Sequence, residues 1–518
     1  MVNLIWLFLA PFFSVLILCV LPFAGSLLKK TAIALSLIPL AILVTHHASW
    51  LGAEVNYAWL PPAVNFHLKV DSLALIFLYL TSILVPISLV TFDSEKTEQP
   101  KYLYSLVLLV EGFLIGFFTA ADLVVFTVFY EAILIPLFFM ISLWGGSHRS
   151  EAALKFIVYM VAGSTLMIAA VIALYFFGPH TFDITQLSLL PANTPYYDWI
   201  GAVFILAFAV KTPLFPLHAW LPDAYYQAPT GGTILLAGLL SKAGIFGFLR
   251  VVLDIFPGLV QTWSPLLLAL AIAGVLYGAL NAWVQNDFKR LIAYSSFSHV
   301  NFILVGLFVL NPVAHSGAIL QAFNHGITIT ALFLVASWLQ ERIQSTRIGQ
   351  YSGLAKYYPH LCWLTVFFTL SSVALPGTNS FIGELMILFG LFGTDPWQTA
   401  FLGLSIIFSV MYMLRWLQKT YFEEPSPLEG IARDIHAREY LIALPLIALI
   451  LWVGIYPAPF LKQTQAAADK IELNAAAPAH KVQVKRVAGP SRPGPGRDAL
   501  VTLPQFYEQL HTAQELTR

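Results

Sequence analysis

The sequence predicts an all-α polytopic membrane protein with about 14 transmembrane helices. Hydrophobic residues make up 58% of the 518-residue chain and only 10% are charged, whereas soluble domains average about 25% charged residues. The mean hydropathy is +0.77. Apolar stretches long enough to cross a bilayer recur along the chain as far as about residue 460. A soluble globular fold is therefore excluded for most of the chain.

The individual spans follow from the length that a membrane requires. A helix needs about 20 apolar residues to cross the hydrocarbon core. The first span is expected to be retained rather than cleaved as a signal sequence, because Met1–Leu4 carry no positive charge and equally apolar segments follow. The predicted spans are 3–24, 30–47, 72–92, 102–120, 122–143, 152–178, 198–221, 230–256, 261–284, 289–309, 313–339, 361–391, 397–420 and 438–460.

The basic residues of alternate loops support this number of spans. Cytoplasmic loops of membrane proteins concentrate lysine and arginine. One set of alternate loops holds fifteen such residues, and the other holds only Lys69 and Arg250. A missed or extra span in the middle would scramble this asymmetry. Since the number of spans is even, we expect both termini on the non-cytoplasmic side.

Two predicted spans contain helix-breaking residues. Pro213 and Pro216 interrupt the seventh span, and Pro376 and Gly377 interrupt the twelfth. Broken helices occur at membrane depth where they line a cavity or are buried in protein. The breaks lie five spans apart, so corresponding helices run in opposite directions, and we expect two inverted five-helix repeats that each contain one discontinuous helix. The alternative is that these prolines reflect only the general frequency of proline in membrane helices.

These features divide the chain into five regions. After the last span the composition changes to Ala, Pro, Gly and charged residues, which predicts a polar, mostly disordered tail. The alternative for 499–516 is a short amphipathic helix against a partner. The regions are 1–101 with the first three spans, 102–256 as the first repeat, 257–420 as the second repeat, 421–461 with the final span, and 462–518 as the tail.

Seven ionisable side chains stand out inside the predicted spans, where each costs at least about 2.5–3.5 kcal/mol near the bilayer centre. Burial moves lysines and carboxylates toward their neutral forms, and histidine titrates near neutral pH without help. The set therefore has the composition of a proton relay. Structural hydrogen bonds remain an alternative for the two histidines, as does pairing with a polar neighbour for Glu111. The seven residues are Glu111, Glu131, Lys211, Lys242, His299, His325 and Glu384.

The two lysines are the most costly members of this set. Lys211 lies two residues before the first break, and Lys242 lies about twelve residues into its span, too deep for easy snorkelling. A lysine and a carboxylate about 4 Å apart attract by roughly 4 kcal/mol at an effective dielectric of about 20. Moving one charge across 100 mV takes about 2.3 kcal/mol. Opening and closing such a pair therefore has the magnitude needed to switch a proton transfer.

Redox and nucleotide chemistry are not encoded in this chain. Its two cysteines, Cys19 and Cys362, lie in apolar segments and cannot form a CxxC motif or ligate an iron–sulfur cluster. The sequence also has no glycine pattern typical of Walker or dinucleotide-binding sites. Any such chemistry coupled to this protein must belong to other chains.

Several motifs in a fixed order resemble the antiporter-like membrane subunits of the proton-pumping NADH:quinone oxidoreductase, respiratory complex I. The resemblance covers roughly residues 70–460, and the tail is longer than this family leads us to expect. The motifs are FYEAILIPLFFMISLWGG (129–146), KFIVY (155–159), FAVKTPLFPLHAWLPDAYYQAPT (208–230), LLSKAGIFGFLR (239–250), NDFKRLIAYSSFSHVNF (286–302), FNHGI (323–327) and LPGTNSFIGELMILFG (375–390).

The resemblance implies a role for six of the seven buried residues and none for Glu111. It implies that glutamate at position 384, where sister subunits tend to carry lysine, distinguishes one type of antiporter-like subunit. The implied roles are an interhelical pair for Glu131 and Lys211, a central lysine for Lys242, a link between the halves for His299 and His325, and the terminal proton-carrying acid for Glu384.

The resemblance also implies the surroundings of the chain. We expect no cofactor in this chain, and FMN, iron–sulfur clusters and quinone in partner subunits. Expected partners are other membrane-arm subunits, including sister antiporter-like subunits, together with protons and the lipid bilayer, and no nucleic acid. The expected location is a bacterial inner membrane. The alternatives are a subunit of a multi-subunit cation/proton antiporter without redox partners, and a purely structural membrane scaffold.

Overall fold

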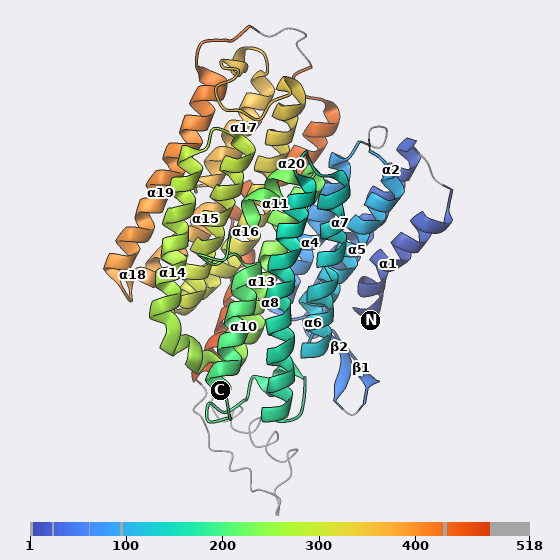
Figure 1. The fold of residues 1–518 in the computed structure, drawn as a ribbon, viewed down its shortest axis with the longest axis vertical. Helices are drawn as coiled ribbons and strands as arrows, with labels where there is room; N and C mark the ends of the chain where they lie inside the picture. The colour runs from blue at the N-terminus through green and yellow to red at the C-terminus, as the bar shows by residue number, and fades with distance from the viewer. Residues whose placement is uncertain (1–3, 23–24, 62, 94–96, 428–432, 477–518) are drawn as a thin grey trace, which may run out of the picture. The chain divides into compact units, whose positions relative to one another are not determined.

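The computed structural model describes all residues except 1–3, 23–24, 62, 94–96, 428–432 and 477–518. Helices form most of the described chain (Figure 1). Up to α12 they are α1 (Leu4–Val20), α2 (Gly25–Ser36), α3 (Ile38–Thr45), η1 (His47–Ser49), α4 (Ser72–Thr91), α5 (Pro100–Thr119), α6 (Leu123–Ala132), α7 (Leu134–Trp144), α8 (Arg149–Phe177), α9 (Ile184–Leu187), α10 (Tyr197–Lys211), α11 (Leu221–Gln227) and α12 (Thr230–Leu235).

The helices that follow α12 include three π-helical segments, η2, η3 and η5. They are η2 (Leu236–Leu240), α13 (Ser241–Gly247), η3 (Phe248–Leu253), α14 (Pro257–Val284), α15 (Phe288–Phe308), α16 (Pro312–Ile343), η4 (Leu354–Lys356), α17 (Pro359–Ser372), α18 (Asn379–Phe392), α19 (Pro396–Leu417), η5 (Gln418–Phe422), α20 (Ala437–Ile455) and α21 (Ala458–Ala476).

Eleven helices among the described residues are long and apolar enough to cross a membrane. Two further apolar helices, α1 and α18, are shorter than 18 residues. The all-α polytopic fold predicted from hydropathy is therefore confirmed. Helix α16 is the most enclosed of the eleven, because every residue in its most apolar window is buried.

Two helical segments end where the sequence places helix-breaking residues. Helix α10 ends at Lys211, and the chain then passes through turns at 212–220 before α11 begins. Pro213 and Pro216 have no N–H to continue the ladder, and the indole nitrogen of Trp220 donates to the carbonyl oxygen of Val210 at 3.0 Å. Helices α17 and α18 are likewise separated by residues 373–378. Both interruptions lie beside ionisable side chains.

A β-hairpin interrupts the helices between α3 and α4, and the sequence analysis did not predict it. Strand β1 (Glu54–Leu60) pairs antiparallel with β2 (Val64–Lys69), with Glu54 opposite Lys69. In β1 only Val55 is buried, so the strand has no alternating apolar pattern that would reveal it. The hairpin contacts the start of α6, because the backbone N–H of Asn65 donates to Asp122.

Helix α21 corrects the prediction that the disordered tail begins at residue 462. The segment 462–476 is helical, and Thr464, Ala467, Ala468 and Ile471 are buried against the bundle. This spacing of three and four residues is typical of an amphipathic helix, and alanine has the highest helix propensity. The low overall hydropathy of the segment concealed this pattern. The predicted alternative helix at 499–516 lies outside the described residues.

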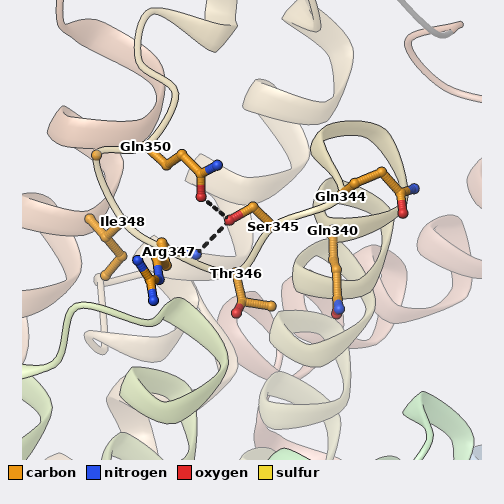
Figure 2. Close-up of a pocket in the computed structure, with 8 residues that line it drawn as sticks. Gln340, Gln344, Ser345, Thr346, Arg347, Ile348 and Gln350 are labelled. Atoms are coloured by element: carbon orange, nitrogen blue, oxygen red, sulfur yellow. Dashed lines mark hydrogen bonds between the residues drawn. The ribbon is translucent and has the colours of Figure 1, made fainter. Parts of the chain in front are cut away.

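The loop after α16 forms a hollow at one end of the molecule. Figure 2 shows Ser345 at its centre, where the hydroxyl donates to the side-chain oxygen of Gln350 and accepts from the backbone N–H of Arg347. The hollow is lined by residues 344–350 and Gln340. None of the predicted relay residues lines it, so we place the functional site elsewhere.

Candidate functional site

Lys242 is fully buried in α13, between the π-helical segments η2 and η3. Its ammonium donates to the carbonyl oxygen of Ala237 at 2.6 Å and to the hydroxyl of Ser241 at 3.2 Å. The third contact joins it to Nδ1 of His325 on α16 at 2.7 Å. π-Helical segments occur frequently at functional sites. The surroundings of Lys242 thus combine two neutral acceptors with one titratable nitrogen.

The two predicted histidines lie close together. The ring centroids of His299 on α15 and His325 on α16 are 6.0 Å apart. In each ring Nδ1 contacts a charged or titratable side chain, whereas Nε2 is buried without a hydrogen-bond partner among the described residues. An imidazole can accept a proton at one nitrogen and release one from the other. Each ring therefore keeps one nitrogen that no other described residue engages.

Glu384 completes the connected group on α18. One of its carboxylate oxygens, Oε1, lies 3.2 Å from Nδ1 of His299 and accepts a hydrogen bond from Nε2 of Gln321 at 3.0 Å. All three side chains are buried or nearly so. The structure thus places four predicted residues, Lys242, His325, His299 and Glu384, in one series of neighbours.

Close packing of α16 against α18 fixes this end of the series. A side chain added to Gly383 would place its Cβ 2.6 Å from the amide oxygen of Gln321. Asn324 and Asn379 also exchange two hydrogen bonds, each from a side-chain amide to the partner's backbone carbonyl. The start of α18 is therefore tied to α16 directly beside His325.

Lys211 lies at the end of α10 with a different set of contacts. Its ammonium donates to the carbonyl oxygen of Tyr130 at 2.7 Å and lies 3.0 Å from the centroid of the Tyr130 ring. No ion pair within 4.0 Å joins it to Glu131 in the described structure, and Oε1 of Glu131 has no hydrogen-bond partner there. The expected direct pair between Glu131 and Lys211 is therefore not formed. The ammonium instead contacts the carbonyl and ring of the neutral residue one position earlier.

Two residues with direct roles in this geometry were not singled out from the sequence. Gln321 lies one helical turn before His325 on α16, which places both side chains on the same face. Tyr130 directly precedes Glu131. A search for polar residues at helical spacing from the ionisable ones would have found Gln321. Glu111, on α5, is fully buried, and neither carboxylate oxygen has a hydrogen-bond partner among the described residues.

A second charged cluster lies outside the spans, at the β-hairpin. His67 contacts Glu54 at 2.7 Å and Asp183 at 3.2 Å. Burial lowers the pKa of His67, but the two carboxylates outweigh burial and hold the pKa above its ordinary value. Burial raises the pKa of Asp183, but His67 and the backbone N–H of Gln186 hold it below its ordinary value. The cluster connects the hairpin to the start of α9.

Arg250, one of the two basic residues in the second set of loops, is also paired. Arg250 donates to both carboxylate oxygens of Asp71, at 2.6 and 2.8 Å, and Lys470 of α21 lies 3.5 Å from the same carboxylate. Burial raises the pKa of Asp71, but Arg250 outweighs it and holds the pKa well below its usual range. This group anchors α21 at the start of α4.

Known proteins resemble the chain over most of its length. A family model described as NADH:quinone oxidoreductase/Mrp antiporter, TM, matches residues 120–411. NADH-quinone oxidoreductase subunit M from Rickettsia conorii is 38% identical over 413 residues, which is 78% of this chain and 83% of that protein. The chain belongs to the NADH-quinone oxidoreductase subunit M family. Subunit M from Escherichia coli is 34% identical over 437 residues, 81% of this chain and 85% of that protein.

Solved structures agree with membership of the subunit M family. A chain of respiratory complex I from Thermus thermophilus with bound NADH has a TM-score of 0.83 and 33% identity, covering 91% of this chain and 99% of that one. A chain of the Mrp complex from Dietzia sp. has a TM-score of 0.80 at 22% identity, covering 91% and 98%. The second likeness shows the fold alone. The resemblance predicted from the motifs is confirmed.

Proposed function

We propose that the chain is a proton-translocating membrane-arm subunit of an NADH-quinone oxidoreductase that couples electron transfer in partner subunits to proton pumping. The observation that carries this proposal is the series Lys242, His325, His299 and Glu384 inside apolar helices. Membership of the subunit M family supports it. The partners are then other membrane-arm subunits, including sister antiporter-like subunits, in an energy-transducing membrane such as the bacterial inner membrane.

We derive the proton transfer from the contacts Lys242–His325 and His299–Glu384, with the two imidazole rings 6.0 Å apart between them. The Lys242 ammonium gives a proton to Nδ1 of neutral His325, 2.7 Å away, and His325 releases one from Nε2. His299 accepts a proton at Nε2 and gives one from Nδ1 to Glu384, 3.2 Å away. Each histidine then needs to exchange its tautomer before the next cycle. No covalent bond between heavy atoms forms or breaks, so the chain contributes translocation and not redox chemistry.

Lys211 and Glu131 supply the switch for this transfer in the proposal. Redox chemistry in partner subunits changes the electrostatics along the membrane arm and moves Glu131 and Lys211 into or out of contact. A closed pair at about 4 Å would hold the ammonium by roughly 4 kcal/mol, whereas its present contacts are with neutral groups of Tyr130. Opening the pair lets Lys211 pass its proton toward Lys242.

The membrane topology belongs to the same proposal. We assign fourteen spans, with the broken segments α10–α11 and α17–α18 as discontinuous helices of two inverted repeats at 102–256 and 257–420. The distribution of lysine and arginine among the loops places both termini on the non-cytoplasmic side. Glu384 then releases its proton toward that side.

Cofactors of the reaction are assigned to partner subunits. FMN, iron–sulfur clusters and quinone supply the redox chemistry of the assembly in this proposal, because the sequence has no motif that would hold them. The two cysteines of this chain are far apart in the sequence, at positions 19 and 362, and neither is paired.

Replacement of Lys242 by alanine tests the proposed function. We expect Lys242→Ala to lower NADH-driven proton pumping by at least about 100-fold, the lower range of a general acid–base contribution, while the complex still assembles. The measurement is proton uptake into membrane vesicles, with assembly checked on a native gel. Lys30→Ala, which removes an exposed lysine, is the control. Full pumping by Lys242→Ala would overturn the relay.

Copurification separates this proposal from an antiporter without redox partners. Extraction in mild detergent should yield flavin- and iron-bearing chains together with this one. Recovery of small membrane subunits alone, with sodium-dependent proton exchange, would support the antiporter alternative. A structural scaffold predicts instead that Lys211→Ala and Glu384→Ala leave activity intact.

A further inference from the structure

Helix α19 and the π-helical segment η5 carry a stripe of buried polar side chains that the relay does not use. Its members are spaced by three or four residues, so they share one face of the helix. Each is at most 5% exposed. Buried polar groups are costly unless they are hydrogen-bonded. The members are Ser405, Ser409, Tyr412, Trp416 and Thr420.

Several members of this polar stripe lack hydrogen-bond partners. The buried Oγ of Ser409, Nε1 of Trp416 and Oγ1 of Thr420 have none among the described residues. Packing alone gives no reason to keep three unsatisfied polar groups on one helix face, because apolar residues of similar shape would fill the same space.

The N-terminal end of the stripe, at Ser405 and Ser409, lies beside the proposed relay. A small cavity touches Ser405 and Ser409 on one side and His299 and Glu384 on the other. About 10 Å³ of it is open to the centres of water molecules, close to the volume that one buried water requires. The cavity therefore gives the hydroxyls of α19 access to the last two members of the relay.

The stripe continues from this cavity toward the other end of α19. Tyr412 shares a hydrogen bond of 2.8 Å with Ser295 on α15. Trp416 stacks on Phe288 at the start of α15, with ring centroids 6.1 Å apart, and Thr420 lies in η5. In the proposed orientation η5 is at the cytoplasmic side. The stripe thus spans the distance between that side and the Glu384 cavity.

We propose that the stripe on α19 is a proton-uptake route from the cytoplasmic side to Glu384 and His299. This inference rests on the proposed function. Serine, threonine and tyrosine hydroxyls each accept and donate one hydrogen bond, so a proton passes along them and the water molecules that they bind, while Trp416, which only donates, orients water without relaying. The final acceptor is the Glu384 carboxylate.

Isosteric variants at Ser409 test the route. Valine and threonine have the same shape, and only threonine keeps the hydroxyl. In the intact oxidoreductase reconstituted in vesicles, we expect Ser409→Val to lower NADH-driven pumping by about three- to tenfold, since general acid–base steps depend on an unbroken hydrogen-bond path. The loss should grow with increasing pH, because uptake from a lower proton concentration becomes limiting. Ser409→Thr should restore most of the rate.

The control and the contrary outcomes keep the test decisive. Gly403→Val adds the same branched side chain on α19, where no atom lies within 4 Å of the new Cβ, and should pump normally. Equal pumping by Ser409→Val and Ser409→Thr from pH 6 to pH 9 would overturn the route. If neither variant assembles, Trp416→Phe provides the test, because it keeps an aromatic ring and removes the indole N–H. We expect a pH-dependent loss of pumping in this variant. A dead Lys242→Ala with a normal Ser409→Val refutes only this inference, whereas a normal Lys242→Ala refutes the proposed function.

Discussion

The two buried lysines sit in different chemical surroundings. The ammonium of Lys211, at the end of α10, contacts the carbonyl and ring of Tyr130, whereas that of Lys242, within α13, contacts the titratable nitrogen of His325. The carbonyl and the ring of Tyr130 cannot take up the Lys211 proton. The imidazole of His325 is a proton acceptor already in contact with Lys242. In the proposed mechanism, transfer from Lys211 therefore requires a movement and transfer from Lys242 does not.

The largest expected effect concerns the histidines beside Lys242. We expect His299→Leu and His325→Leu each to lower proton pumping by about 100-fold or more, because each removes a proton acceptor. The double variant should pump no worse than either single one, since residues that act as a unit are not additive. The initial pumping rates of the unaltered protein, the two single variants and the double variant form a double-mutant cycle. Losses that multiply would show that the two rings act independently.

Substitution of Gln321 tests how Glu384 is held at the end of the connected series. A hydrogen bond to a charged group contributes about 1.5–3 kcal/mol, so Gln321→Leu should slow pumping by roughly tenfold or more. Gly383→Ala should have a similar effect, because its Cβ would lie 2.6 Å from the Gln321 amide oxygen. The pH profile of pumping should shift in both, which a change in packing alone would not produce.

The matched control for Gly383 is Gly403→Ala, since Gly403 has open space around its Cβ position. It should pump at the normal rate with an unchanged pH profile. A normal pH profile in Gln321→Leu would contradict a positioning role for this residue.

Tyr130 tests the other side of the comparison. A desolvated cation–π contact contributes about 2 kcal/mol, so Tyr130→Leu should slow pumping by roughly 30-fold. Tyr130→Phe keeps the ring and the backbone carbonyl and loses a hydroxyl that has no hydrogen-bond partner in the described structure. It should stay within about twofold of the normal rate. A large loss in Tyr130→Phe would show that the hydroxyl itself takes part.

The smallest expected effect is a pH dependence of the hairpin, which lies outside the spans. The pKa of His67 is raised in the folded protein, so its contribution to stability is complete below its ordinary value of 6.5 and is lost as the pH rises through the raised value. The lowered pKa of Asp183 acts in the opposite sense, and its contribution is lost as the pH falls through the lowered value. The hairpin should be most stable between these limits.

Hydrogen exchange of the β1–β2 amides measures this dependence. The expected change is about 1 kcal/mol or less, because Glu54 is substantially exposed and solvent screens the pair. His67→Gln should remove the high-pH loss. Persistence of that loss in His67→Gln would assign it to another group.

Sequence reasoning succeeded where one residue's neighbours along the chain determine its environment. The long apolar runs around α4, α5 and α16 could form only membrane helices, and the structure has them. The prolines at 213 and 216 could not continue a helix, and α10 ends at Lys211. Sequence reasoning failed for α21, because its buried stripe of alanine and isoleucine lies within a polar composition.

Contacts between distant residues were beyond the reach of the sequence. Lys242 and His325 are 83 positions apart and meet at 2.7 Å, and the adjacent residues Tyr130 and Glu131 could not be ranked as partners of Lys211. A rotation of α6 by one residue decides which of these two residues contacts Lys211. A pattern of residue types does not fix such a rotation.

By itself the sequence determined that this is a helical membrane protein with buried lysines, histidines and acids, because hydropathy and charge act locally. Only the tertiary structure decided which of these groups touch. The close approach of α16 to α18, with no room for a side chain at Gly383, aligns Gln321 with Glu384. Lys242 meets His325, and Lys211 meets Tyr130 instead of Glu131. Packed interiors allow few arrangements, and the contacts follow from the one that the whole chain adopts.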